Sequence, residues 1–260
     1  MVKRGGGRGK REGRLGYALG LPLAILMIAP FIYMVATALT GGGDARRVPL
    51  GRFLVNSAVF SLAVVAGQVL TSATAAYAFA RLRFPGRDRV FLAYLSVLTV
   101  PGVLLVIPRF VIIDALGWVD SYQGLISTEL VSVAGIFLLR QFFRAIPRDL
   151  EDAARLEGAD EWTIFWRVFL PASRPALGAF AVLAFADQWR SFLWPLVATR
   201  SSGMQPVEVG MANLQGMYDL SWADQMAVAA AAMIPLVILY FVAQKYFVRG
   251  MLPGVGTCKG

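Results

Sequence analysis

The chain has 260 residues, of which 57% are hydrophobic and 16% are charged. A soluble domain typically has about 45–50% apolar and about 25% charged residues, so the composition excludes an ordinary soluble domain and indicates a membrane protein. One cysteine and no histidine exclude an intrachain disulfide, a cysteine-rich metal site and imidazole chemistry, while the formal charge of +9 has to be located before it is assigned to a partner.

The first apolar run covers residues 15–39 and contains no charged residue. As a helix it would be roughly 37 Å long, which exceeds the hydrocarbon core of about 30 Å. The basic residues before it and the Ala36-Thr37-Ala38 triplet also fit a cleavable signal peptide. Because a secretory apolar region is only about 7–15 residues long and further runs follow, we interpret residues 15–39 as a retained span. Residues 1–14 are then expected to be a disordered basic tail in the cytoplasm.

Five further apolar runs bring the predicted number of transmembrane helices to six, which gives an all-α polytopic membrane protein. They cover residues 54–80, 90–108, 121–142, 176–199 and 226–248. Prolines interrupt these runs at Pro101, Pro108, Pro195 and Pro235. In lipid, a broken helix persists only where neighbouring helices or a cavity satisfy the freed carbonyl groups. The prolines therefore predict a packed bundle with a lumen.

The distribution of basic residues predicts the orientation of this bundle. With the N-terminus placed in the cytoplasm, 19 of the 25 basic residues lie in cytoplasmic segments and 5 lie in outer loops. This asymmetry follows the positive-inside rule, so both termini are predicted to be cytoplasmic. The net charge then reflects membrane topology and not a nucleic-acid surface. None of the four lysines lies in a G-x-x-x-x-G-K-[ST] motif, so any nucleotide energy must come from another polypeptide.

The segment between the fourth and fifth spans predicts two short helices. The first covers residues 146–158, with Pro147 in its first turn and Gly158 as its left-handed stop. Asp160 can cap the second helix, and Leu170-Pro171 is expected to end it. The apolar face of the second helix consists of Ile164, Phe165, Val168 and Phe169.

The same segment is strongly acidic on a side of the membrane that is otherwise basic. Residues 149–161 contain a single arginine and six carboxylates, namely Asp149, Glu151, Asp152, Glu157, Asp160 and Glu161. Anionic lipid would repel this island. The charges favour a docking element for a soluble protein, and an ordinary solvated amphipathic loop is the alternative.

The residue spacing in this segment resembles a known motif. Residues 150–159, followed by Ile164-Phe165-Trp166-Arg167 and Leu170-Pro171, closely resemble the EAA loop of ABC importer permeases in its sugar-permease form. Similarity to the MalG type of permease extends over about residues 15–260. It is carried by residues 77–87, by Trp189 and residues 192–196, and by residues 247–250.

The resemblance implies a type I ABC importer permease with a MetI/MalG-like bundle over residues 15–248, a coupling loop at 144–175 and a cytoplasmic tail at 249–260. Such a chain is not an enzyme and forms half of the path for a sugar or sugar-like solute. The implied partners are a second MalF-like permease, two copies of an ABC ATPase, an extracytoplasmic solute-binding protein and membrane lipid, with no nucleic acid. ATP and Mg would bind the ATPase, so this chain needs no cofactor. The implied location is a bacterial or archaeal plasma membrane.

By the same resemblance, the coupling loop is seated in a cleft of the ATPase. The residues implied in this contact are Glu151, Asp152, Ala153, Ala154, Gly158, Ala159, Leu170 and Pro171. The small alanines permit close approach and Gly158 turns the chain. The glutamate that is usual in the motif is Asp152 here, one methylene shorter. A salt bridge known from relatives would therefore need a water or would be made by Glu151.

Polar and aromatic groups within the spans are candidates for the solute path. They are Asn56, Asp187, Trp189, Arg190 and Trp194. Asp187 and Arg190 are three residues apart and share a helical face. Because a charge at the centre of a membrane helix costs about 2.5–3.5 kcal/mol, the two should pair with each other or face a cavity, where Arg190 would contact solute. The tryptophans either stack on a sugar ring or anchor the bundle at the interface.

Two other classes of function were weighed against the permease. An intramembrane enzyme lacks a plausible nucleophile and base, since histidine is absent and Cys258 lies near the C-terminus. A self-contained secondary transporter or channel acting as a homodimer stays open, although no inverted repeat is evident. Only the ABC permease requires the acidic docking loop.

Overall fold

The computed structural model describes residues 8–40, 43–214, 216 and 220–250, with side chains described between Gly20 and Gln244. All regular structure in these ranges is helical. The helices form two compact units. The first unit combines the chain up to Val48 with Asn213–Met233, and the second combines Pro49–Ala212 with the chain from Ile234 onward.

The first unit contains α1 (Arg8–Ala38), η1 (Asp44–Arg47) and the beginning of α14 (Trp222–Gly250). The predicted span at residues 15–39 is one continuous helix through Ala38. The helix begins at Arg8, however, so residues 8–14 are helical and not disordered as predicted. Arginine, lysine and glutamate are good helix formers, and extending an existing helix avoids a new nucleation cost. The remainder of the predicted tails, residues 1–7 and 251–260 with Cys258, lies outside the described residues.

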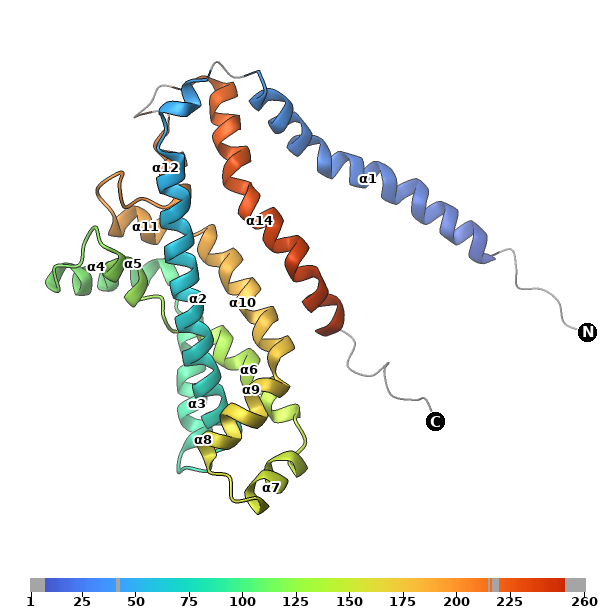
Figure 1. Ribbon diagram of the computed structural model, residues 1–260, viewed down its shortest axis with the longest axis vertical. Coiled ribbons are helices and arrows are strands. Elements are labelled where there is room, and N and C mark those ends of the chain that lie inside the picture. Colours follow the sequence, from blue (N-terminus) through green and yellow to red (C-terminus); the bar gives the residue numbers. More distant parts are fainter. Residues whose placement is uncertain (1–7, 41–42, 215, 217–219, 251–260) are drawn as a thin grey trace, which may run out of the picture. The chain divides into compact units, whose positions relative to one another are not determined.

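The core of the second unit is built around α2 (Leu50–Ala80), which lies beside α6 (Val133–Ala145) and α10 (Arg174–Trp189) (Figure 1). Close approach of these helices depends on small residues, as is usual between helices in a membrane. At Gly135 of α6, an added Cβ would lie 2.2 Å from the Phe180 ring of α10. Only glycine fits there without a rearrangement.

Shorter elements extend from both ends of α2. They are α3 (Arg87–Leu95), η2 (Ser96–Thr99), η3 (Gly102–Leu105), α4 (Val106–Ala115), α5 (Tyr122–Ser127), α7 (Asp149–Leu156), α8 (Glu161–Ile164), η4 (Phe165–Phe169), α9 (Leu170–Ala172), α11 (Leu193–Ala198) and α12 (Val207–Ala212). Within the second unit, α7 and α8 lie near one end of α2, whereas α4, α5 and α11 lie toward the other (Figure 1).

The predicted spans differ in continuity. Within the described ranges, three helical stretches are long and apolar enough to cross a membrane unbroken, namely Gly20–Ala38, Leu50–Ala80 and Trp222–Gln244. Two further stretches are long and apolar enough to cross a membrane only if two helices that meet at a bend are counted together. Arg87–Thr99 and Gly102–Ala115 meet at 96°, and Glu161–Ala172 and Arg174–Trp189 meet at 74°. The predicted run at residues 121–142 is divided between α5 and α6. The six apolar runs are therefore not six unbroken helices.

The prolines account for some of these breaks and not for others. Pro101 lies at the 96° bend, where its missing N–H cannot continue a helix. Pro195 lies in the first turn of α11, a position that suits proline, and the break before it falls at residues 190–192. The break expected at Pro235 is absent, because α14 continues through it. Neighbouring groups in membrane helices commonly compensate a single proline.

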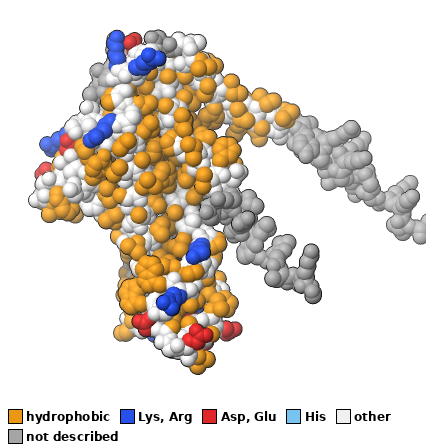
Figure 2. Space-filling view, viewed as in Figure 1, with side chains coloured by type: hydrophobic (Ala, Val, Ile, Leu, Met, Phe, Trp, Pro, Cys, Tyr) orange, Lys and Arg blue, Asp and Glu red, His pale blue; other side chains and the backbone are white. Residues whose placement is uncertain are grey.

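The surface of the second unit separates apolar from charged side chains. On the face drawn in Figure 2, hydrophobic side chains cover much of the region of α2 and α10, whereas charged side chains lie mainly toward the ends, including the end that carries α7 and α8. Large apolar side chains of α2 and α3 are exposed in the isolated chain, including Leu62 and Leu92. An apolar surface of this kind belongs in lipid or against another membrane helix.

Candidate functional site

The first candidate site is the helical hairpin formed by α7 and the α8–α9 segment. Its local signals follow the sequence prediction. Gly158 has a φ of +82° after α7, the left-handed conformation expected of a helix stop. The Asp160 carboxylate accepts a hydrogen bond from the Thr163 N–H at 2.9 Å, which caps α8. Hydrogen bonding from the Thr163 side chain, and next from the Thr163 N–H, holds the pKa of the Asp160 carboxyl below its ordinary value.

Two boundaries of the hairpin differ from the prediction. Pro147 lies before α7, whose cap is Arg148, because the chain is still extended at Ile146. Leu170-Pro171 does not end the second helix, which continues to Ala172. A wide π-helical turn precedes Pro171, with the Leu170 N–H donating to the Phe165 carbonyl. This turn displaces the carbonyl that the proline ring would otherwise meet.

The predicted apolar face of the second helix is confirmed. Ile164, Phe165 and Phe169 are buried, and Val168 packs beside them. The ring of Phe169 makes an edge contact with Tyr77 of α2, at 5.0 Å between centroids. The second helix therefore anchors the hairpin through apolar packing, and polar contacts also tie α7 to the bundle.

A set of five side chains, which we call the Arg81 network, ties α7 to the bundle. Its members are Tyr77, Arg81, Glu151, Arg155 and Glu161. Arg155 donates hydrogen bonds to the carboxylates of Glu151, at 2.9 Å, and Glu161. The Tyr77 hydroxyl donates to Glu161 at 2.7 Å. An Arg81 nitrogen lies 3.6 Å from the second oxygen of Glu151.

Arg81 is the centre of this network and also holds the end of α6. It donates hydrogen bonds to the carbonyl of Phe143, at 2.6 Å, and to that of Ile146. A cation near the carboxyl end of a helix interacts favourably with the helix dipole. Burial lowers the pKa of the Arg81 guanidinium, and the Glu151 carboxylate opposes this shift. One arginine thus joins α2, α6 and α7.

The coupling residues implied by the motif fall into two groups. Glu151 is buried, and Ala154 and Ala159 pack against the apolar core. Asp152, Ala153, Gly158 and Pro171 are exposed, and Leu170 is half-buried. Within the described part of the chain Asp152 makes no ion pair, so the internal salt bridge is made by Glu151 and not by the residue at the usual glutamate position.

The sequence analysis missed the apolar part of this exposed surface. Leu156, at the end of α7, is 91% exposed, and Trp162 and Trp166 of the second helix are also exposed. A leucine between Arg155 and Glu157 on a short polar helix was the available signal. A hollow of about 360 Å³ lies between α7 and the second helix, lined by Gly158, Thr163 and Arg167 among others.

The second candidate site is the predicted solute path, and three of its five residues are used internally. Asn56 is buried and donates to the carbonyls of Gly203 and Gln205, at 2.9 and 3.0 Å, while its own carbonyl accepts from the Tyr122 hydroxyl. The Trp194 indole donates to the Leu125 carbonyl at 3.0 Å. Trp189 is buried and stacks on Phe185. In this chain these three side chains make internal contacts, and their place in the solute path stays a prediction.

The expected pair of Asp187 and Arg190 does not form. Both side chains are exposed, and no ion pair joins them within 4 Å. Arg190 instead donates a hydrogen bond to the Ala186 carbonyl at 3.1 Å. Its positive charge also attracts the Glu208 carboxylate of α12 electrostatically. Burial raises the pKa of the Glu208 carboxyl, and the Arg190 charge opposes that shift.

An ion pair between Arg109 of α4 and Glu129 also lies in this region. The sequence did not predict it. The Arg109 guanidinium also lies 6.0 Å from the Trp194 ring centre, and Asp187 acts electrostatically on Glu129. These residues come from segments that are far apart in the sequence, so no local pattern predicted the contact. No three acidic or cysteine side chains of the described ranges gather into a possible metal site.

Comparison with known proteins places these features in a family. The family described as "Binding-protein-dependent transport system inner membrane component" matches residues 68–253. The arabinooligosaccharides transport system permease protein AraQ of Halalkalibacterium halodurans is 35% identical over 205 residues, which cover 79% of this chain and 73% of that protein. The sn-glycerol-3-phosphate transport system permease protein UgpE of Yersinia pestis is 34% identical over 209 residues, covering 78% and 73%.

A solved structure shares the fold. It belongs to a bacterial ABC transporter involved in the import of the acidic polysaccharide alginate. The TM-score is 0.80 at 22% sequence identity, with 95% of this chain and 100% of that chain covered. The chain thus has the fold of a known membrane transporter.

Proposed function

The chain belongs to the family of binding-protein-dependent transport system inner membrane components and is a multi-pass membrane protein. We therefore propose that it is the permease subunit of an ATP-binding-cassette importer. In this role it forms half of the path for a sugar or sugar-like solute. The solute class is supported by the names of the similar permeases, which transport arabinooligosaccharides and sn-glycerol 3-phosphate.

The observation that carries this proposal is the division of α7 into an anchored and a free face. Glu151 is buried in the Arg81 network, whereas Asp152, Ala153 and Leu156 are exposed. A leucine that is 91% exposed beside small and acidic residues suits a contact with another protein better than contact with lipid. The partner on this face is an ABC ATPase, and the hollow beside Gly158 can receive one of its side chains.

The Arg81 network gives this contact a mechanical consequence. Because Arg81 joins α7 to α2 and to the end of α6, a displacement of α7 is passed to the two helices at the core of the bundle. ATP-driven closure of an ATPase dimer would move α7 and rock the permease between inward-open and outward-open states. ATP and Mg would bind the ATPase, so the permease chain supplies no catalytic residue and needs no cofactor.

The complete importer would contain this chain, a second MalF-like permease, two ATPase copies and an extracytoplasmic solute-binding protein. The end of the bundle with α7 then faces the cytoplasm, as do both termini, in agreement with the 19 basic residues assigned to that side. Asp187 and Arg190 are the candidate path residues that stay accessible, since both are exposed in the isolated chain.

The test is recovery of the native complex in mild detergent, with identification of the co-purified subunits by mass spectrometry. We expect an ABC ATPase and a second permease with the wild-type chain, and loss of the ATPase with Leu156→Glu. Leu116→Glu, at a leucine that directly follows α4 and is 52% exposed, is the matched control and should retain the ATPase. A chain that purifies as a homodimer and transports without ATP would establish the secondary-transporter alternative instead.

A further inference from the structure

A large hollow lies beside the turn between α2 and α3, and it adjoins a second hollow whose lining includes Asp152 of α7. Its volume is about 880 Å³, and its lining includes Arg83, Arg87, Arg89 and Arg148 with a single carboxylate, Asp88. The lining comes from two segments that are separate in the sequence, the α2–α3 turn and the residue before α7. The fold therefore brings the positive charges together.

The one carboxylate in this hollow is already occupied. Asp88 accepts hydrogen bonds from Arg140, at 3.2 Å, and from Arg87, at 3.4 Å. Over the described residues, Arg83, Arg89 and Arg148 form no ion pair. Within its own lining, the hollow thus has four arginines and one carboxylate, an excess of positive charge.

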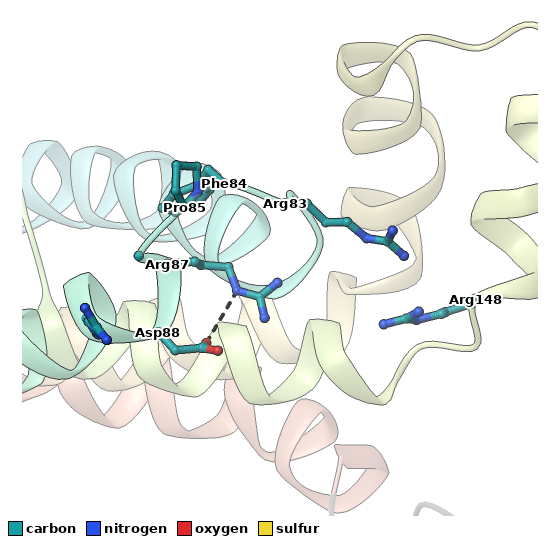
Figure 3. A pocket seen from close by; sticks show the side chains of 8 residues that line it. Arg83, Phe84, Pro85, Arg87, Asp88 and Arg148 are labelled. Carbon is teal, nitrogen blue, oxygen red and sulfur yellow. Dashed lines mark hydrogen bonds and ion pairs between the residues drawn. The ribbon is translucent and has the colours of Figure 1, made fainter.

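The arginine side chains also converge. In Figure 3 the side chains of Arg83, Arg87 and Arg148 extend into the same space from different segments. Like charges placed together repel each other, and a bound anion removes this cost. Arginine is well suited to the task, because its planar guanidinium donates paired hydrogen bonds to phosphate oxygens.

The surroundings of the hollow indicate the source of the anion. α3 begins at Arg87 and exposes large apolar side chains directly after it, with Val90 52% and Leu92 66% exposed. Phe84, also on the rim, is exposed as well. Basic groups next to an exposed apolar helix match the two parts of a phospholipid, because the headgroup is charged and the acyl chains are not.

We propose that Arg83, Arg87 and Arg148 bind the phosphate group of an anionic phospholipid, whose acyl chains lie along the exposed apolar surface of α3. Arg83 and Arg148 supply charge that forms no ion pair within the described ranges, while Arg87 is held in place by its bonds to Asp88 and to the Leu82 carbonyl. A soluble phosphate would meet the same arginines, but it would make no use of Val90 and Leu92.

The experiment uses the full chain, purified with its native partners in mild detergent and stripped of lipid. Dioleoylphosphatidylglycerol or dioleoylphosphatidylcholine is titrated in, and native mass spectrometry counts the lipids retained on the chain. The wild type should retain phosphatidylglycerol in preference to phosphatidylcholine. The double variant Arg83→Gln with Arg148→Gln should weaken retention by roughly fivefold for each arginine removed.

The matched control is Arg144→Gln with Arg174→Gln, which removes the same charge from exposed arginines outside the hollow and should leave retention unchanged. If the double variant does not purify as a folded chain, Arg83→Lys keeps the charge, loses the paired geometry and should still weaken retention. Equal retention of the two lipids, or equal loss in the control, would overturn the proposal. Displacement of the lipid by millimolar inorganic phosphate would also overturn the proposal. The same holds if the double variant loses a protein subunit and keeps the lipid.

Discussion

Replacing Glu151 with glutamine should release α7 from the bundle without unfolding the protein. The Glu151 side chain is 11% exposed, and its two oxygens face Arg155 and Arg81 at 2.9 and 3.6 Å. Glutamine keeps the shape and removes the negative charge. Arg81 would keep its bonds to the carbonyls of Phe143 and Ile146 but would lose its only carboxylate partner in the described chain.

The magnitude follows from the burial of the two partners. Removing one member of a buried ion pair costs about 3–5 kcal/mol. The Arg155 contact adds little, because that side chain is nearly half exposed and such helical pairs contribute about 0.3–0.5 kcal/mol. The glutamine amide also retains part of the hydrogen bonding. We therefore expect docking of α7 to weaken by about 2–3 kcal/mol.

The assay is hydrogen exchange of the α7 amides, followed by mass spectrometry in the purified complex. A loss of this size should accelerate exchange through local opening by roughly 30- to 150-fold, since about 1.4 kcal/mol corresponds to a factor of ten. Amides in α2 and α6 should change little. Uptake of solute should fall further than ATP hydrolysis, because α7 transmits the motion.

The neighbouring residue supplies the control. Asp152→Asn makes the same chemical change one residue away on the exposed face, and it should alter the stability of α7 by no more than about 0.5 kcal/mol. Equal acceleration of exchange in the two variants would refute the assignment of the internal salt bridge to Glu151. Unchanged exchange in Glu151→Gln would show that the Arg81 network does not hold α7.

Three further outcomes are expected. Asp160→Ala should lower the melting temperature, whereas Asp160→Asn should retain the cap. Because the pKa of the Asp160 carboxyl is depressed in the folded protein, the stability that it contributes is complete above the ordinary carboxyl pKa and is lost only as the pH falls through the lower folded value. A melting temperature that changed between pH 6 and 8 on account of Asp160 would contradict this. Gly135→Ala should cost about 1–3 kcal/mol in denaturant unfolding, since its Cβ would overlap the Phe180 ring, whereas Gly203→Ala meets nothing closer than 3.9 Å and should be neutral. Arg190→Ala should leave the melting temperature unchanged and weaken solute uptake; normal uptake would remove Arg190 from the solute path.

The parts of the fold that could be predicted from the sequence are those decided by neighbours in the chain. The left-handed turn at Gly158, the cap at Asp160 and the buried face at Ile164, Phe165 and Phe169 all follow from φ preferences, a short hydrogen bond and helical periodicity. The long apolar runs likewise predicted α1, α2 and α14, because the thickness of the bilayer sets a minimum length.

Only the tertiary structure decides which hydrogen-bond and ion-pair partners the polar side chains meet. Asn56 meets the Gly203 carbonyl 147 positions away, and Arg81 meets the Phe143 carbonyl 62 positions away. Spacing along one helix suggested that Asp187 pairs with Arg190 or that both face a cavity. The resemblance to the EAA motif left open whether the salt bridge known from relatives needs a water at Asp152 or is made by Glu151. Packing instead places Asp187 near Glu129, which carries a like charge, places Arg190 near Glu208, and buries Glu151 against Arg81. A local pattern fixes which face of a helix a side chain occupies, but the group that it meets is set by the helix that packs there.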